Sequence, residues 1–275
     1  MRLVRKYWLD AVALVLATVV FVVPFGLVLL TAAKDRVQAA RRDLSWPTSW
    51  HVRENISEVV SARDGMLLTA TKNSVILTVV SVTLLVLTCS MAGFVLERRR
   101  DRTARAVNAM VLAGLIIPPA VVPTIFVLQK LNLFKTIWGL VLVEVAYVAP
   151  FSILLFRAFV ATIPREIDEA AMIDGCSGFK LFVRVIFPLL RPVTITVIVT
   201  TSIIIYNDFV NPLYFLPGSD NATVQLTLYN FQGQYNTQWN LLFTDVLLIT
   251  IPPLVMFMIF SRKIVSGLTA GALKA

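Results

Sequence analysis

The sequence predicts an all-α integral membrane protein with six transmembrane helices, and three observations support this fold class. Of its 275 residues, 57% are hydrophobic and 15% are charged, whereas a typical soluble domain is about 45–50% apolar and about 25% charged. The apolar residues form stretches of 16 to 24 residues without Asp, Glu, Lys or Arg, and about 20 such residues span a bilayer. This composition makes a soluble enzyme, a secreted disulfide module or a disordered tail a poor interpretation. Six spans would also leave little sequence for a separate soluble domain.

Each apolar block is expected to be a helix, because an open strand edge would leave unpaired backbone groups in lipid. The first block is too long for the h-region of a signal peptide, which has about 7–15 residues, so we expect it to be retained. Pro118, Pro119 and Pro123 are expected to kink the third span. The blocks are Ala11–Ala33, Asn73–Leu96, Ala106–Gln129, Thr136–Phe156 with Glu144 inside it, Pro192 to Asp208, and Trp239–Ser261 with Asp245 near its start.

The distribution of basic residues predicts that both termini lie in the cytoplasm. In that orientation 16 Lys and Arg residues lie inside and 9 lie outside, as the positive-inside rule requires. Arg98, Arg99 and Arg100 are then interpreted as a topological anchor rather than a ligand site. The net charge of +9 reflects span ends and not a basic patch interleaved with aromatics, so we expect no nucleic-acid partner.

Three parts are expected along the chain. Residues 1–70 hold the first transmembrane helix and an outer loop, residues 71–263 form a five-helix core, and residues 264–275 form a cytoplasmic tail. Within the core, residues 163–188 make the cytoplasmic connection between helices 4 and 5. This connection carries the most informative motif in the sequence.

Residues 163–188 have the signals of a short, capped helix outside the membrane. Pro164 suits the first turn, the acids Glu166, Asp168 and Glu169 favour the positive end of the helix dipole, and Gly175 suits a left-handed terminus. A second helix is expected to follow, with one apolar stripe made of Phe179, Phe182, Val183 and Ile186. Two interpretations stay open on the residues alone: an interfacial hairpin that joins two spans, or a docking surface with small Ala170 and Ala171 exposed.

The same segment resembles the signature loop of permease subunits of binding-protein-dependent ABC importers. That signature is Glu-Ala-Ala, three residues, Gly, nine residues, then Ile-x-Leu-Pro, and this chain has Val185 and Phe187 in place of Ile and Leu. Three further segments are similar to that family, the last of them to its carbohydrate class of second-permease, maltose-transporter-like type, with Ala275 where Gly is usual: Asn73-Ser74, Tyr206-Asn207-Asp208-Phe209 and Gly267 to Lys274.

The resemblance implies a permease subunit that moves a sugar or oligosaccharide across a bacterial or archaeal cytoplasmic membrane by alternating access. Glu169, Ala170, Ala171 and Gly175 would form the coupling helix that docks on a separate ATPase. To these we add the acids Glu166 and Asp174 as candidate partners for basic residues. The resemblance also implies a second homologous permease, two ATPase subunits that bind ATP and Mg²⁺, and an extracytoplasmic solute-binding protein.

The chain itself is expected to be a non-catalytic subunit that binds no cofactor. Its sequence has no Gly-x4-Gly-Lys-Ser/Thr phosphate loop, which is the element that cradles ATP phosphates in P-loop enzymes. ATP hydrolysis is therefore assigned to the partner subunits, and the partners of this chain are expected to be other proteins, the sugar and membrane lipid.

Polar residues at membrane depth are candidates for a substrate pathway, because ionisable groups there usually face a bundle interior or an aqueous path. The candidates are Glu144, Tyr206, Asn207, Asp208 and Asn211. The alternatives are structural: Glu144 bonds to a neighbouring helix, and Asp208 caps a broken one. Three other functions stay open: an ion-coupled secondary transporter with Glu144 and Asp208 as a proton relay, an ABC permease for a non-sugar solute, and a scaffolding membrane subunit.

Overall fold

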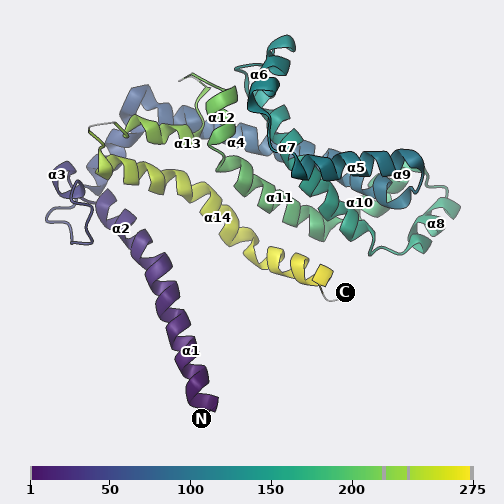
Figure 1. Ribbon diagram of the computed structural model, residues 1–275, viewed down its shortest axis with the longest axis horizontal. Helices are drawn as coiled ribbons and strands as arrows, with labels where there is room; N and C mark the ends of the chain where they lie inside the picture. Colours follow the sequence, from purple (N-terminus) through teal and green to yellow (C-terminus); the bar gives the residue numbers. More distant parts are fainter. Residues whose placement is uncertain (1, 219–220, 234–235, 273–275) are drawn as a thin grey trace. The chain divides into compact units, whose positions relative to one another are not determined.

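The computed structural model describes residues 2–218, 221–233 and 236–272, and for residues 2–7, 9 and 260–272 it describes the backbone alone. These residues form helices joined by loops, with no β-strand among them (Figure 1). The helices are α1 (Arg2–Ala17), the π-helical turn η1 (Thr18–Val22), α2 (Val23–Ala32), α3 (Arg36–Ala39), α4 (Val52–Arg98), α5 (Arg102–Ile116), α6 (Val121–Lys130), α7 (Ile137–Val160), α8 (Arg165–Ile173), α9 (Gly178–Leu181), the π-helical turn η2 (Phe182–Ile186), α10 (Phe187–Leu189), α11 (Arg191–Tyr206), α12 (Val210–Phe215), α13 (Val224–Thr227), the 3-10 turn η4 (Leu228–Asn230) and α14 (Trp239–Ala272).

The chain divides into two compact units. The first unit consists of residues 1–71 and 224–251, and the second unit consists of residues 72–223 and 252–275. Both α4 and α14 contribute residues to each unit. The second unit contains most of the predicted five-helix core, including the loop that resembles a coupling segment.

The structure confirms an all-α membrane protein. Among the described residues, four helices are long and apolar enough to cross a bilayer, and these are Asp10–Ala32, Val52–Arg98, Ile137–Val160 and Trp239–Ile259. A fifth candidate is a bent pair of helices, Gly178–Leu189 and Arg191–Tyr206, which meet at 77°. The side of the membrane on which each terminus lies stays a prediction.

The third predicted span is broken rather than kinked, which corrects the expectation from the sequence. α5 ends at Ile116 and α6 begins at Val121, so the residues between them leave the helix. Pro118 and Pro119 explain the break, since proline lacks the backbone N–H that a helix needs and pushes the residue before it into an extended conformation. Ile117 has that conformation, with φ −75° and ψ 122°.

α4 extends well before the block that predicted it. It starts at Val52 and contains a short non-helical segment, residues 62–65, in which Arg63, Asp64 and Gly65 have positive φ angles of 47°, 56° and 77°. The predicted span from Asn73 to Leu96 lies in the uninterrupted part after this segment. The earlier part belongs to the first unit.

In the first unit, the loop after α2 is held by a fully buried lysine. The Nζ atom of Lys34 donates to Asp43 Oδ1 at 2.8 Å, to the Asp43 carbonyl at 2.8 Å and to Ser45 Oγ at 3.1 Å. The amide of Asn55 donates to the carbonyls of Ala32 and Lys34 at 2.8 and 2.9 Å, and so pairs the carbonyls that the end of α2 leaves free. These contacts fix the loop after α2, which the sequence left without a structure.

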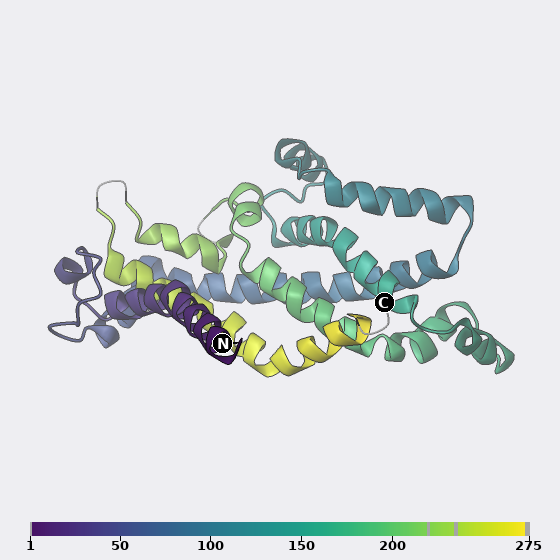
Figure 2. The same cartoon turned by 60° about the horizontal axis from the view of Figure 1, so that its bottom comes forward.

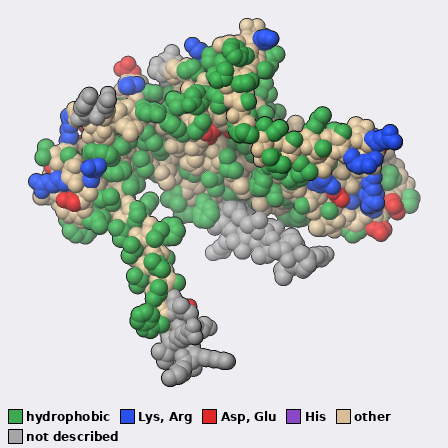
Figure 3. Space-filling model, viewed as in Figure 1, with side chains coloured by type: hydrophobic (Ala, Val, Ile, Leu, Met, Phe, Trp, Pro, Cys, Tyr) green, Lys and Arg blue, Asp and Glu red, His purple; other side chains and the backbone are tan. Residues whose placement is uncertain are grey.

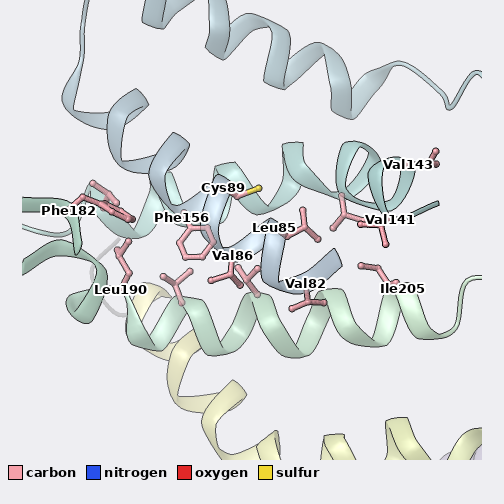
Figure 4. Packing of buried hydrophobic residues seen from close by; sticks show 14 of the residues in the cluster. Val82, Leu85, Val86, Cys89, Val141, Val143, Phe156, Phe182, Leu190 and Ile205 are labelled. Carbon is pink, nitrogen blue, oxygen red and sulfur yellow. The ribbon is translucent and has the colours of Figure 1, made fainter. Parts of the chain in front are cut away.

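In the second unit, α4, α7 and α11 enclose the main hydrophobic core. Figure 4 shows Val86 and Cys89 of α4 lying near Phe156 of α7, with Val82 of α4 and Ile205 of α11 further along the same core. Gly93 lets α4 and α7 approach closely, because a Cβ atom there would lie 2.7 Å from Phe156 Cβ and 2.9 Å from the backbone nitrogen of Arg157. The two helices are therefore in backbone contact at this turn.

We expect Gly93→Ala to destabilise the second unit by about 1–3 kcal/mol, because the added methyl group must push two packed helices apart. The measurement is the free energy of unfolding in mixed micelles as the denaturing detergent fraction rises. Gly26→Ala is the matched control, since a Cβ atom at Gly26 meets nothing within 4 Å. Equal unfolding free energies for the two variants would contradict the close packing.

We expect the stability of the loop at residues 35–50 to depend on pH through Asp43. The pKa of Asp43 is lowered from 3.8 to about 2, chiefly by the hydrogen bond from Lys34 and then by that from Ser45. A lowered pKa means that the carboxylate stabilises the folded loop above the ordinary pKa and that this contribution is lost as the pH falls through about 2. In hydrogen exchange of residues 35–50, Asp43→Asn should lower protection relative to wild type above pH ~4.

The difference between wild type and Asp43→Asn should shrink toward pH 2, where Asp43 is itself protonated. Asp64→Asn is the control, because Asp64 is exposed and lies outside this loop. A constant difference between the proteins at every pH would show that the charge of Asp43 is not what holds the loop.

Candidate functional site

The predicted capped helix in the loop between the fourth and fifth spans is present as α8. Pro164 directly precedes it, and Glu166 and Asp168 lie in its first turn. Gly175 ends it with φ +81°, and the N–H groups of Gly175 and Cys176 donate to the carbonyls of Met172 and Ala171 at 3.0 and 2.9 Å. This left-handed glycine terminus is the one that the sequence predicted.

The second predicted helix of the loop is present, but its apolar stripe is wrong. It consists of α9, the π-helical turn η2 and α10, and the π turn shifts the phase of the helix by an extra residue. Leu181, Phe182 and Ile186 are buried, whereas Phe179 is 71% exposed and Val183 is also exposed. The buried face therefore includes Leu181 and excludes Phe179 and Val183, so it is rotated relative to the predicted stripe.

The predicted docking residues of the loop divide into exposed and buried groups. Glu166, Glu169, Ala170, Asp174 and Gly175 are exposed. Ala171 is only 8% exposed and belongs to the hydrophobic core cluster of the second unit. The expectation that both alanines lie on the surface is therefore wrong for Ala171, which holds α8 onto the core.

Two exposed apolar residues of α8 were missed from the sequence. Ile173 is 86% exposed, and Met172 beside it is also exposed. A signal was available, because Ile167 and Ala171 are spaced i, i+4 and so mark the face of α8 that packs inward, and Ile173 lies off that face. Phe179 of α9 is a third exposed apolar residue of the same loop.

The loop lies at the end of the second unit where α4 ends and α5 begins (Figure 2). Lys and Arg side chains gather over this end, next to acidic side chains (Figure 3). Arg98 differs from its neighbours Arg99 and Arg100, which are exposed, because its side chain is only 14% exposed. It forms an ion pair with Asp168 of α8, with Nε and Oδ2 2.6 Å apart.

Three of the predicted pathway residues lie together in the second unit. Glu144 of α7 is buried, and its Oε1 accepts a hydrogen bond of 3.2 Å from the amide of Asn211 in α12. The carboxyl group of Asp208 interacts with Glu144, while its Oδ1 accepts from the N–H of Val210 at 2.8 Å at the start of α12. Both structural alternatives are thus present: Glu144 joins two helices, and Asp208 caps one.

The other two pathway residues lie elsewhere. Tyr206 is buried and lines a cavity of about 420 Å³ between α4, α11 and α14, together with Thr78, Ser202 and Pro252. Asn207 is exposed, and its amide donates to the carbonyl of Ile203 at 2.9 Å. The structure therefore separates the aromatic candidate from the acid and amide cluster, although all five residues belong to the second unit.

The tail motif lies at the edge of what the structure describes. Residues 267–272 continue α14, and residues 273–275, which include Lys274, lie outside the described residues. In the described part of the chain, no group of three or more His, Cys, Asp or Glu side chains is placed to hold a metal ion.

Comparisons with known proteins relate this arrangement to one family. Residues 86–270 match the family model for the inner membrane component of binding-protein-dependent transport systems. The chain is 29% identical over 273 residues to a probable starch degradation products transport system permease of Thermoanaerobacterium thermosulfurigenes, covering 98% of each chain. It is also 30% identical over 205 residues to the melibiose/raffinose/stachyose import permease of Bacillus subtilis, covering 74% of each chain.

A solved structure shares the fold. The chain superposes with a TM-score of 0.84 on a chain in the crystal structure of a bacterial ABC transporter involved in the import of the acidic polysaccharide alginate. The superposition covers 95% of this chain and 98% of that chain, with 16% sequence identity. The two chains therefore share a fold.

Proposed function

The chain belongs to the family of inner membrane components of binding-protein-dependent transport systems, and from this premise we propose that it is the permease subunit of an ATP-driven importer for a sugar or oligosaccharide. The family match covers the core from α4 to α14, including the whole of α8. The sugar class is supported by relatives whose names refer to starch degradation products and to melibiose, raffinose and stachyose.

The observation that carries this proposal is the surface of α8. An isolated helix of nine residues gains no stability from leaving Ile173 almost fully in water, and exposed apolar groups rimmed by polar ones are typical of protein interfaces. Glu166, Glu169 and Ile173 are spaced i, i+3, i+7 and so share one face of α8, and the exposed Asp174 follows directly. We propose that a separate ATPase covers Ile173 and pairs basic residues with the acids, so that ATP-driven closure moves α8.

Ala170 and Gly175 complete the proposed docking face. Ala170 is exposed between the acids, and its small side chain permits close approach by a partner. Gly175 has no atoms within 4 Å of the position of a Cβ, so its role is to end the helix with a positive φ. Ala171 contributes from the inner side, where it fixes α8 to the core.

The proposed assembly contains a second homologous permease, two ATPase subunits that hold ATP and Mg²⁺, and an extracytoplasmic binding protein. This chain would be its non-catalytic, multi-pass subunit in a bacterial or archaeal cytoplasmic membrane. The spans of one chain are too few to enclose a sugar path, since a binding site buries most of the ligand surface. The requirement for a binding protein follows from the family description itself.

We propose that the cluster of Glu144, Asp208 and Asn211 lines the sugar path, because carboxylate and amide groups match the donors and acceptors of a polyhydroxy substrate. Tyr206 and Asn207 flank the cluster in sequence, at the end of α11. Tyr206 would offer an aromatic face from its own cavity, and Asn207 an exposed amide.

The function is tested by sugar uptake into proteoliposomes that contain the whole importer. ATP and the loaded binding protein should both be required, and a protonophore should leave uptake unchanged. Glu169→Arg and Ile173→Asp should each reduce uptake by roughly tenfold or more, because a reversed charge or a buried acid opposes docking by several kcal/mol. Glu58→Arg, an equal charge change at an exposed site in the first unit, is the control.

Uptake that continues without ATP, or that collapses with the proton gradient at constant ATP, would favour an ion-coupled transporter instead. Co-purification with the partner subunits in the absence of any transport would favour a scaffold. Wild-type uptake by Glu169→Arg and Ile173→Asp would remove α8 from the proposed coupling surface.

The pathway assignment is tested by the KM for sugar uptake. Asp208→Asn keeps an oxygen acceptor for the Val210 N–H and removes the charge, and Asn211→Ala removes the partner of Glu144. Loss of a hydrogen bond to a charged group costs about 1.5–3 kcal/mol, so KM should rise roughly tenfold or more. Gln129→Ala, at an exposed amide near the end of α6, should leave KM unchanged; the same lack of effect in both test variants would exclude the cluster from the path.

A further inference from the structure

The last turn of α4 carries two neighbouring residues of opposite charge that bind different parts of the second unit. Arg98 is the final residue of α4, and it makes three hydrogen bonds to the α8 segment. Its Nε donates to Asp168 Oδ2 at 2.6 Å, and its Nη2 donates to Asp168 Oδ1 at 3.3 Å and to the carbonyl of Ile163 at 3.0 Å. Arg98 therefore binds both the first turn of α8 and the chain that enters it.

This ion pair is shielded from solvent. The side chains of Arg98 and Asp168 are 14% and 10% exposed, whereas Arg99 and Arg100 are exposed. A planar guanidinium that binds a carboxylate through two nitrogens fixes orientation as well as distance, and a pair removed from water is screened little by salt. The contact therefore fixes the distance and the orientation of α8 relative to the end of α4.

The preceding residue, Glu97, binds the same end of α4 to the membrane helices. Its Oε2 accepts from Arg157 Nε of α7 at 2.9 Å, and Arg157 also donates to the side-chain oxygen of Asn108 in α5. Two adjacent residues thus connect α8, α4, α7 and α5 through one chain of charged hydrogen bonds.

Apolar packing near the end of α4 reinforces this connection. One turn before Glu97, Gly93 brings the backbone of α4 against Phe156 of α7. Phe94 lies with its ring centroid 5.7 Å from that of Phe182, in the segment that follows α8. The end of α4 therefore contacts α7, α8 and the segment that follows α8.

The covalent chain does not provide this link. α8 is joined directly to α7 and α9 only, and Arg98 is 70 residues away from Asp168 in sequence. A displacement of α8 would reach α4 promptly only through side-chain contacts, of which the Arg98–Asp168 pair is directional and close to buried.

We propose that Arg98 is a positioning residue for transport: its pairing with Asp168 passes the movement of α8 to α4, and Glu97 passes it on to α7 and α5 through Arg157. This inference rests on the proposed function and deepens it, since it assigns the route by which the docking loop moves the spans. The predicted topological role of Arg98 needs only its charge, whereas passing movement from α8 to α4 needs the planar guanidinium and its pairing with Asp168.

The test uses the complete importer in proteoliposomes, with sugar uptake and ATP hydrolysis measured in the same sample. The variants are Arg98→Gln, Asp168→Asn, Arg98→Lys and the exchange of Arg98→Asp with Asp168→Arg. Arg98→Gln and Asp168→Asn should keep the ATPase bound and active but lower the uptake per ATP by roughly tenfold, within the 5- to 150-fold range typical of coupling between two sites.

The exchanged pair should recover much of the ratio, and Arg98→Lys should lose part of it because an ammonium lacks the two-nitrogen fork. Arg100→Gln, at an exposed neighbour, is the matched control and should couple as wild type. A wild-type ratio in both Arg98→Gln and Asp168→Asn would overturn the inference. So would an Arg98→Lys protein that couples fully while Arg98→Gln fails to assemble, because Arg98 would then serve folding alone.

Failure of the proposed function gives a different result, read from the wild-type importer before any variant is compared. In that case the wild-type complex shows no ATP-dependent sugar uptake. The inference about Arg98 fails only when wild-type transport is present and its ratio to ATP hydrolysis does not depend on the ion pair.

Discussion

The close approach of α4 to α7 at Gly93 is the contact on which the second unit depends. Because no Cβ intervenes, the two backbones meet at this turn, and the core residues on either side can interdigitate. One turn later the same spacing brings Glu97 within hydrogen-bonding distance of Arg157. The next residue, Arg98, then reaches Asp168 of α8, so the loop that leaves the bundle is held by the packing inside it.

A second constraint is the cost of burying charge, which the chain meets by pairing. Lys34 is fully buried and donates to three oxygens. Glu144 is buried and accepts from Asn211. Removing a charge from water is tolerated when hydrogen bonds replace those of water, and such groups are retained in membrane proteins mainly where they join helices or face a path. A buried residue such as Glu144 can therefore join two helices and also line a substrate path.

Prediction from the sequence succeeded where the cause was local. The caps of α8 were predicted because Pro164 and Gly175 act within one turn. Prediction failed where distant parts meet: Phe182 and Ile186 pack into the core whereas Phe179 does not, and Ala171 is buried because the core lies on its side of α8. The third span is an intermediate case, since its prolines were evident and were expected to kink the helix, but they break it.

The sequence by itself determined that this protein is helical, lies in a membrane and carries a capped helix in one loop, because lipid admits few backbone conformations and helix caps act over a few residues. The tertiary structure alone decided which residues of that loop face outward and which hold it in place. Arg98 is indistinguishable from Arg99 and Arg100 in a run of like charges. Only the folded chain brings Arg98 to Asp168, 70 residues away, because a contact at that separation depends on how α4 packs on α7 and α8 on the core.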